Sequence, residues 1–375
     1  MIILQTQNFI HEASLSSLLS TLEKHAYLAD ETGQTQPESL RALRSSGLLG
    51  SIIPTEYGGK GETIWFASKL IEQLATVDPS IAIVVHQHLL VVTSLLNKGS
   101  EKQKRTYLPK LSSGEWIAAS AWSETGSGAG KQTVGTKNDE GNWVINGVKT
   151  FTTGAGLADL YLVLVQTVSS DAGTEAAQHG QTFFLIEKEQ VVAVDTQSGL
   201  SGMRGSSTRF IEFHRSVLTS DHILGEVGGS VELKIALRES GLTLGAISVG
   251  ISEAAFRIAL DYVERKGLAA SQSLQVRLSE LHMWIDAARA LVDKVAERSS
   301  DNLKLSASQS KILASEVSEK VCREVQQIVG GTGYMRGHKI ERLYRDARGV
   351  SLMGPVNYLA REMVGREIVS EPFRF

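Results

Sequence analysis

The residues of this sequence whose types and spacing could do chemistry lie in three short segments. Two combine glycine with hydroxyl side chains, WSETGSGAG from Trp122 to Gly130 and KTFTTGA from Lys149 to Ala155. Glycine lets the backbone approach a flat ligand closely, and Ser and Thr hydroxyls can hydrogen-bond to its polar edge. The third, QIVGGTGY from Gln327 to Tyr334, places two glycines at an expected helix end, where free N–H groups can face a pyrophosphate. Taken alone, the glycines of the first segment form a glycine-rich loop of little specificity.

Each of these segments also has an ordinary reading. The glycine-rich segment can be a plain loop, and the glycines after Val329 can simply cap a helix. Other chemistries find less support. His86 and His88 are two residues apart, which separates their side chains on a helix and disfavours a shared metal. Cys322 is the only cysteine, so neither an intrachain disulfide nor a cysteine-based metal cage is expected. A serine hydrolase would need a G-x-S-x-G segment, which the sequence lacks.

The composition is that of an ordinary globular protein. The chain has 375 residues, 42% of them hydrophobic, and a formal net charge of −3. Because basic residues are scattered among acids, neither nucleic acid nor an anionic membrane is an expected partner. No stretch reaches about 18 uninterrupted apolar residues, so we expect no membrane span, and a cytoplasmic location.

Periodicity divides the chain into three parts. Residues 12–111 carry apolar side chains at helical spacing, residues 116–224 contain short β-rich runs with a candidate hairpin turn at Asn146-Gly147, and long helical patterns return after Gly229, beginning with one over 231–266. We therefore expect an α+β fold. The predicted domains are an N-terminal helical domain (1–115), a middle β domain (116–228) and a C-terminal helical bundle (229–375).

Taken together, the segments resemble the acyl-CoA dehydrogenase family. The resemblance rests on GLLGSIIPTEYGG (47–59), the two glycine–hydroxyl segments, the stretch from Gly199 to Glu226, and QIVGGTGYMRGHKIERLYRDA (327–347). It implies a helical domain, a β-barrel or sandwich and a four-helix bundle. It also implies an FAD-dependent oxidoreductase that oxidises an acyl thioester carried by coenzyme A or an acyl carrier protein. The stretch from Gly199 to Glu226 looks architectural, so we assign its arginines no chemistry.

The resemblance also implies roles for individual residues. Trp122 and Ser123 would lie beside the isoalloxazine ring, Phe151 would pack on it, and Thr153 would hydrogen-bond near its N5. Further implied contacts are Gly128 and Ala129 to the thioester, and Arg265, Gln327, Gly330 and Gly331 to FAD across a subunit boundary. A site completed by two subunits implies a homodimer or homotetramer.

One departure from the family concerns the catalytic base. The family's proton-abstracting glutamate corresponds, counted from Asp346-Ala347, to Gly354. Some members carry this glutamate on the first bundle helix, at the position of Ser240, so its neighbour Glu239 is a candidate base and otherwise a solvent-facing acid.

Three functions therefore stay open. The first is a dehydrogenase with a displaced or absent base, served by an electron-transfer partner. The second is a flavin-dependent oxygenase on the same fold, which would need a flavin reductase and oxygen but no α-proton base. The third is a non-catalytic homologue.

Overall fold

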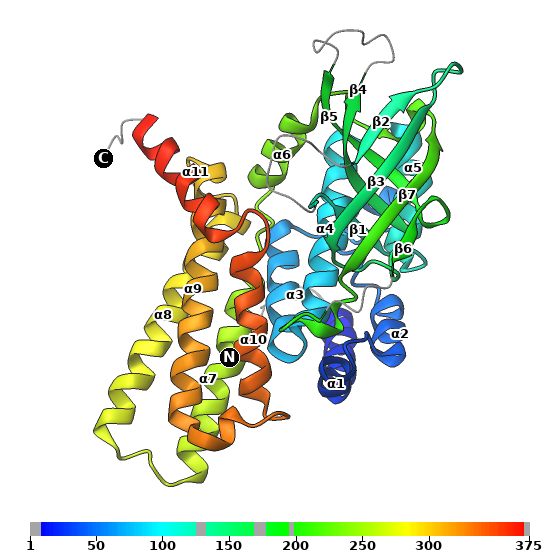
Figure 1. The fold of residues 1–375 in the computed structure, drawn as a ribbon. Coiled ribbons are helices and arrows are strands. Elements are labelled where there is room, and N and C mark those ends of the chain that lie inside the picture. The colour runs from blue at the N-terminus through cyan, green and yellow to red at the C-terminus, as the bar shows by residue number, and fades with distance from the viewer. Residues whose placement is uncertain (1–8, 125–132, 169–177, 195–198, 371–375) are drawn as a thin grey trace.

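The chain folds in the predicted order of helices, strands and helices (Figure 1). The computed structural model describes residues 9–124, 133–168, 178–194 and 199–370. The order confirms the α+β fold with a helical domain, a middle sheet and a helical C-terminal domain. We propose that the domains meet near residues 115 and 228, where helices give way to strands and strands to helices.

The N-terminal helices are α1 (Phe9–Thr32), α2 (Pro37–Ser45), α3 (Ile64–Val77), α4 (Pro79–Lys98) and α5 (Glu101–Ser113). Among these helices, α4 packs against α3 and α5, and α1 packs against α2 and α3. Helix α4 starts at Asp78, whose carboxylate accepts hydrogen bonds from the backbone N–H groups of Ser80 and Ile81, and Pro79 occupies its first turn. Among the described helices only α4 is long and apolar enough to cross a membrane, but 83% of its apolar window is buried, as in a core helix.

The middle strands form one mixed sheet. They are β1 (Ala118–Ala121), β2 (Val134–Lys137), β3 (Trp143–Thr152), β4 (Leu160–Val168), β5 (Gln178–Glu187), β6 (Val192–Val194), β7 (Arg209–Leu218) and β8 (Ile223–Leu224). Their order is β6-β7-β3-β2-β4-β5-β8, and β1 pairs in parallel with β4.

The predicted hairpin turn at Asn146-Gly147 was wrong. Both residues lie inside β3, where the pairing with β7 shifts register between Ile145 and Gly147. The turn between β2 and β3 lies earlier, where Asn138 Oδ1 accepts the backbone N–H of Asn142 at 2.9 Å. Between these two pairs β7 has two residues, His214 and Arg215, opposite Asn146 alone, so the extra residue of this bulge lies in β7.

The C-terminal part is a bundle of long helices. It contains α6 (Ser230–Glu239), α7 (Gly245–Arg265), α8 (Gln272–Ala296), α9 (Leu303–Val329), α10 (Lys339–Leu352) and α11 (Asn357–Ser370). The single helix expected over 231–266 is in fact two, α6 and α7. The break falls at Gly241, whose φ of +90° suits glycine and whose added Cβ would lie 2.7 Å from the Val295 carbonyl oxygen.

Helices α3 and α4 connect the bundle to the sheet. Helix α7 packs so closely on α3 that a Cβ on Gly250 would lie 2.2 Å from the Glu72 carbonyl oxygen. Helix α4 contacts β1 as well as α6 and α7. Side chains of α4 can therefore face the sheet and the bundle together.

Candidate active site

A cavity of about 470 Å³, which we call the central cavity, opens where α4, the sheet and α10 meet. Its walls come from segments far apart in the sequence. The lining residues are His86, Gln87, Leu90, Ser120, Trp122, Ser123, Phe151, Thr153, Leu200, Ser201, Gly202, Met203, Ser206, Thr208, Leu244, Arg345, Arg348, Gly349, Leu352, Met353 and Gly354.

Four of the predicted ring-contacting residues, Trp122, Ser123, Phe151 and Thr153, line this cavity together. Phe151 is 60% exposed and has a φ of +51°, an unusual backbone conformation for a bulky residue. Such a conformation costs on the order of 1–3 kcal/mol and is typical of functional sites. Its ring is therefore held out from the sheet, although an aromatic side chain in a strand would ordinarily be buried.

The hydroxyl groups on the sheet side form a short chain. Thr153 Oγ1 lies 3.1 Å from Thr208 Oγ1, which lies 2.8 Å from Ser206 Oγ. Behind them Lys149, with a fully buried side chain, forms an ion pair with Glu124, which directly follows Ser123. The ion pair joins Glu124, in the described part of the first glycine–hydroxyl segment, to the second segment.

Two polar groups in the cavity wall have no hydrogen-bond partner among the described residues. They are both ring nitrogens of His86 and the indole Nε1 of Trp122. His86 is only 3% exposed, and burial lowers its pKa to about 4. A buried polar group left unsatisfied costs about 1–3 kcal/mol. Sequence reasoning set His86 aside as an ordinary core or surface histidine.

His88, two residues further along the same helix, behaves as a structural residue. Its Nε2 lies 3.2 Å from the Leu49 carbonyl oxygen, and its Nδ1 lies 3.2 Å from the Ala118 backbone nitrogen. It therefore ties α4 to β1. The two histidines do not share a ligand, and no group of three His, Cys, Asp or Glu residues in the described ranges could hold a metal ion.

Gly354 lies in the cavity wall on the loop between α10 and α11. A Cβ built on it would meet no atom within 4 Å. Lys311 of α9 fixes this loop, because its Nζ donates to the carbonyl oxygens of Met353 at 3.1 Å and Pro355 at 2.9 Å, and to Asn357 Oδ1 at 2.7 Å. Burial lowers the pKa of Lys311 to about 8. The described lining contains no Asp or Glu that could act as a base.

Glu239 does not reach the central cavity. It is exposed at the end of α6, and together with Ser240 it lines a separate cavity of about 720 Å³ between α3, α4 and the end of α8. This position agrees with the reading of Glu239 as a solvent-facing acid.

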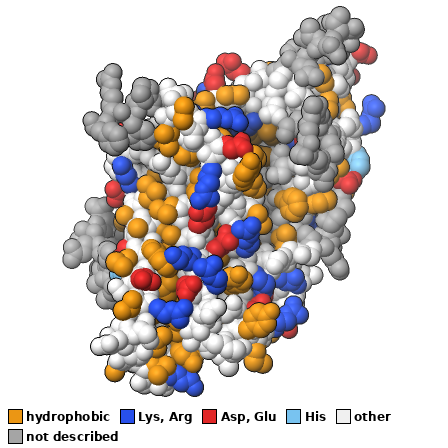
Figure 2. Space-filling model, turned by 60° about the vertical axis from the view of Figure 1, so that its left-hand side comes forward, with side chains coloured by type: hydrophobic (Ala, Val, Ile, Leu, Met, Phe, Trp, Pro, Cys, Tyr) orange, Lys and Arg blue, Asp and Glu red, His pale blue; other side chains and the backbone are white. Residues whose placement is uncertain are grey.

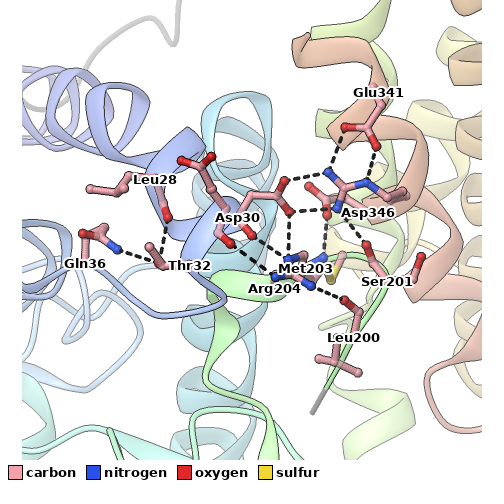
Figure 3. A network of polar contacts seen from close by, with 12 residues as sticks. Leu28, Asp30, Thr32, Gln36, Leu200, Ser201, Met203, Arg204, Glu341 and Asp346 are labelled. Atoms are coloured by element: carbon pink, nitrogen blue, oxygen red, sulfur yellow. Dashed lines mark hydrogen bonds and ion pairs between the residues drawn. The ribbon is translucent and has the colours of Figure 1, made fainter. Parts of the chain in front are cut away.

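A polar network fixes the cavity wall beside α10 (Figure 3). Arg345 donates to both carboxylate oxygens of Asp30 in α1, at 2.8 and 2.6 Å, and to Glu341 in its own helix. These hydrogen bonds raise the pKa of Arg345. Arg204 reaches the backbone of the same α1 turn, and buried Asp346 accepts the Met203 N–H, so the stretch from Leu200 to Ser206 is held between α1 and α10. Arg204 is thus architectural, as expected.

The remaining predicted residues lie elsewhere. Arg265, Gln327, Gly330 and Gly331 are exposed at the end of the bundle where α7 and α9 finish, and none of them lines the central cavity (Figure 1). This chain alone does not bring them to the ring-contacting residues. Gly128 and Ala129 lie outside the described residues.

Comparison with known proteins decides the family. The models of the N-terminal, middle and C-terminal domains of acyl-CoA dehydrogenase match residues 10–115, 119–216 and 231–369. The chain belongs to the acyl-CoA dehydrogenase family. It is 31% identical to the probable acyl-CoA dehydrogenase FadE25 of Mycobacterium tuberculosis, over 96% of this chain and 95% of that protein.

Solved structures show the same fold. Butyryl-CoA dehydrogenase from Megasphaera elsdenii superposes with a TM-score of 0.86 at 27% identity, over 97% of this chain and 99% of that one. Dibenzothiophene monooxygenase (TdsC) from Paenibacillus sp. A11-2 superposes with a TM-score of 0.83 at 21% identity, over 98% of each chain. The second likeness concerns the fold alone.

The predicted flavin enzyme is therefore confirmed at the level of the family: the chain is a flavoprotein oxidoreductase of the acyl-CoA dehydrogenase family, for which FAD is the typical cofactor. The cavity fits a planar ring. Exposed Phe151 and partly buried Trp122 are the aromatic residues of its lining, and Ser123 and Thr153 bring hydroxyl groups to the same lining.

Proposed function

We propose that this protein oxidises an acyl thioester, carried by coenzyme A or an acyl carrier protein, in the central cavity with FAD as cofactor. One observation supports the proposal most directly. The two segments that resemble the family's flavin segments meet the loop of Gly354 at a single cavity. The name of FadE25, a relative along nearly the whole chain, points to the same substrate class.

The proposal assigns roles to the residues in the wall. Trp122 and Phe151 would pack against the isoalloxazine ring, and Ser123 and Thr153 would hydrogen-bond to its edge. Bound FAD would supply the acceptor for a hydride from the carbon β to the thioester carbonyl. The protein itself would orient the thioester and exclude water. The α proton must also leave, and the described cavity wall offers no carboxylate to accept it.

Anaerobic reduction tests the proposal. The purified protein is expected to be yellow and to bleach when an acyl-CoA is added without oxygen. Because a Cβ at position 354 would meet no atom within 4 Å, Gly354→Glu can introduce a carboxylate at the family's position, and a positioned base contributes roughly 100- to 10,000-fold. G354E should therefore bleach with butyryl-CoA at least ~100-fold faster than the matched variant G354Q. Equal rates would show that the α proton is taken elsewhere, and a protein unable to take up FAD would overturn the proposal.

An oxygenase is the second candidate, and the absence of Asp and Glu from the described cavity lining favours it. Oxygen insertion does not require removal of an α proton. Under this alternative the protein binds flavin but does not bleach with any acyl-CoA, and it consumes oxygen when NADH and a flavin reductase are supplied. Oxygen uptake that depends on an added organic substrate would decide for it.

We further propose a cytoplasmic homodimer or homotetramer that passes electrons to a protein partner, or to oxygen in the oxygenase case. The exposed position of Gln327, Gly330 and Gly331 supports contact with a second copy. So do the hydrophobic side chains on the bundle surface, which Figure 2 shows interspersed with charged ones; they include Val276, Met283, Tyr334, Met335 and Tyr344. Light scattering of the purified protein gives the number of copies, and a monomer that still binds FAD would overturn the shared site.

A further inference from the structure

The proposed function leaves one buried acid beside the central cavity unused, Asp346 of α10 (Figure 3). Asp346 is 2% exposed and is not among the lining residues, but its Oδ1 accepts the backbone N–H of Met203. Met203 belongs to the stretch from Leu200 to Ser206, which we call the wall segment because five of its seven residues line the cavity. A carboxyl group therefore holds the cavity wall from behind.

The wall segment depends on its contacts with α10. Met203 has a φ of +50°, an unfavourable backbone conformation for a bulky residue, and a Cβ on Gly202 would lie 2.3 Å from the Arg345 carbonyl oxygen. Two side chains of α10 bond to the backbone of the segment, Arg345 to the Ser201 carbonyl oxygen at 2.7 Å and Asp346 to the Met203 N–H. A guanidinium stays charged in proteins, whereas a carboxyl group can gain a proton. Of these two attachments, only the one from Asp346 can change with pH.

Neither guanidinium beside Asp346 forms an ion pair with it. Arg345 donates to both carboxylate oxygens of Asp30 on α1 and to both of Glu341. Arg342, one turn before Asp346, donates instead to a backbone carbonyl oxygen of α3 at 3.0 Å, and its Nε has no partner among the described residues. Within the described part of the chain, Asp346 therefore has a hydrogen bond but no ion pair.

Burial decides the protonation of this carboxyl group. Removal from water raises the pKa of Asp346 from an ordinary 3.8 to about 7, and the Asp30 carboxylate adds to the rise. The guanidinium groups of Arg342 and Arg345 and the N–H of Met203 oppose the rise, but burial outweighs them. Asp346 therefore gains or loses its proton near neutral pH.

Three further charged or titratable groups lie around this cluster. On α9 the thiol of Cys322 is buried, which raises its pKa, so it stays neutral. Arg204, in the wall segment, lies toward Asp30, with its Nε 3.8 Å from Oδ1 of that residue. Asp78, at the start of α4, is buried beside Arg342. Asp346 is thus the carboxyl group that bonds directly to the backbone of the wall segment.

We infer that Asp346 is a positioning residue that holds the wall segment in place, and that it does so more tightly when its carboxyl group carries a proton. The ionised carboxylate is buried without an ion pair, so hydration favours a state in which the segment has moved away from it. The protonated group escapes this cost, and its carbonyl oxygen can still accept the Met203 N–H.

The sign and size of the pH effect follow from the two protonation equilibria. The pKa of Asp346 is about 7 when the wall is closed and takes its ordinary value of 3.8 when the group is hydrated. The proton therefore favours the closed wall below about pH 7, and this advantage is lost as the pH rises through 7. Closure should be about tenfold less favourable at pH 8 than at pH 6.

Hydrogen exchange of the FAD-loaded protein at pH 6 and pH 8 tests this inference. Mass spectrometry gives the protection of the wall-segment amides after correction for the intrinsic exchange rate at each pH. In wild type this protection should fall about tenfold from pH 6 to pH 8. D346N has a neutral side chain whose oxygen can accept the Met203 N–H, so it should show no fall. D346L has no acceptor and should have at least ~10-fold less protection than wild type at pH 6.

The matched control is D139N, at an exposed residue of the turn between β2 and β3, which should keep the wild-type pH dependence. The affinity for FAD gives a second readout, and this one rests on the proposed function. Wild type should hold FAD about tenfold more weakly at pH 8 than at pH 6, measured by the fluorescence of FAD released on dilution, and D346N should not.

The outcomes separate the two levels of the argument. If wild type and D346N show the same change in wall-segment protection between pH 6 and pH 8, or if D346N loses as much protection as D346L, the role of Asp346 is wrong. If protection changes as expected but the FAD affinities of wild type and D346N share one pH dependence, Asp346 still positions the wall, and the placement of FAD in the central cavity is wrong.

Discussion

The burial of His86 and His88 predicts that acid destabilises this protein. Burial lowers the pKa of each imidazole from an ordinary 6.5 to about 4. Between these two values the unfolded chain binds more protons than the folded one, so the free energy of unfolding falls as the pH falls from about 6.5 to about 4. Above about pH 7 both states are neutral at these residues, and this contribution is flat.

The size of the effect follows from the same two values. At pH 5 an unfolded-state pKa of 6.5 and a folded-state value of about 4 give a loss of about 2 kcal/mol per histidine relative to pH 8. Two such residues lose about 4 kcal/mol together, a large share of the 5–15 kcal/mol by which proteins are ordinarily stable. H86L removes one of the two buried imidazoles without breaking a protein hydrogen bond. Between pH 8 and pH 5 the free energy of unfolding of H86L should therefore fall by about 2 kcal/mol less than that of wild type.

Urea unfolding followed by tryptophan fluorescence at pH 8 and pH 5 provides the assay. The informative quantity is the difference between wild type and H86L in the free energy of unfolding lost from pH 8 to pH 5, because all other titrating groups are common to both proteins. If wild type and H86L lost the same free energy of unfolding between pH 8 and pH 5, the burial argument for His86 would be refuted.

Three further predictions concern the framework. Gly250→Ala should destabilise the protein by about 1–3 kcal/mol, since its Cβ would lie 2.2 Å from the Glu72 carbonyl oxygen and force α7 away from α3; a lower urea midpoint at constant slope would show this. Lys149→Met removes the cation beside buried Glu124 and should cost about 3–5 kcal/mol, much of it recovered when Glu124 is also replaced by Leu. Lys311→Met should speed hydrogen exchange in the loop between α10 and α11 by at least ~10-fold, as hydrogen bonds to the lysine are lost.

The sequence was most informative where function depends on a local segment. Trp122 directly precedes Ser123, and Phe151 lies two residues before Thr153. Each pair stands in a short segment that can be recognised in the sequence. Their meeting at one cavity was implied by the resemblance and not by the residues alone. The helical and β-rich regions were likewise predictable, because their periods differ over long stretches of chain.

Features set by neighbours distant in sequence were not predictable. Asn146-Gly147 is a strong local turn signal, yet β3 continues through both residues, because Asn146 pairs with β2 and Gly147 pairs with β7. His86 and His88 look equivalent in the sequence, and only the positions of Leu49 and Ala118 make one of them a structural residue. Lys311 fixes the loop of Gly354 through hydrogen bonds to carbonyl groups that lie 40 or more residues away in the sequence.

Gly354 and the neutral His86 are best understood together. A carboxylate at position 354 would bring a negative charge into the cavity that His86 lines, where low dielectric strengthens charge interactions. Such a charge favours the protonated imidazole and would raise the pKa of His86. With glycine at 354, the described lining brings no carboxylate to the imidazole, which stays neutral at pH 7. Gly354 therefore contributes to keeping the buried His86 uncharged.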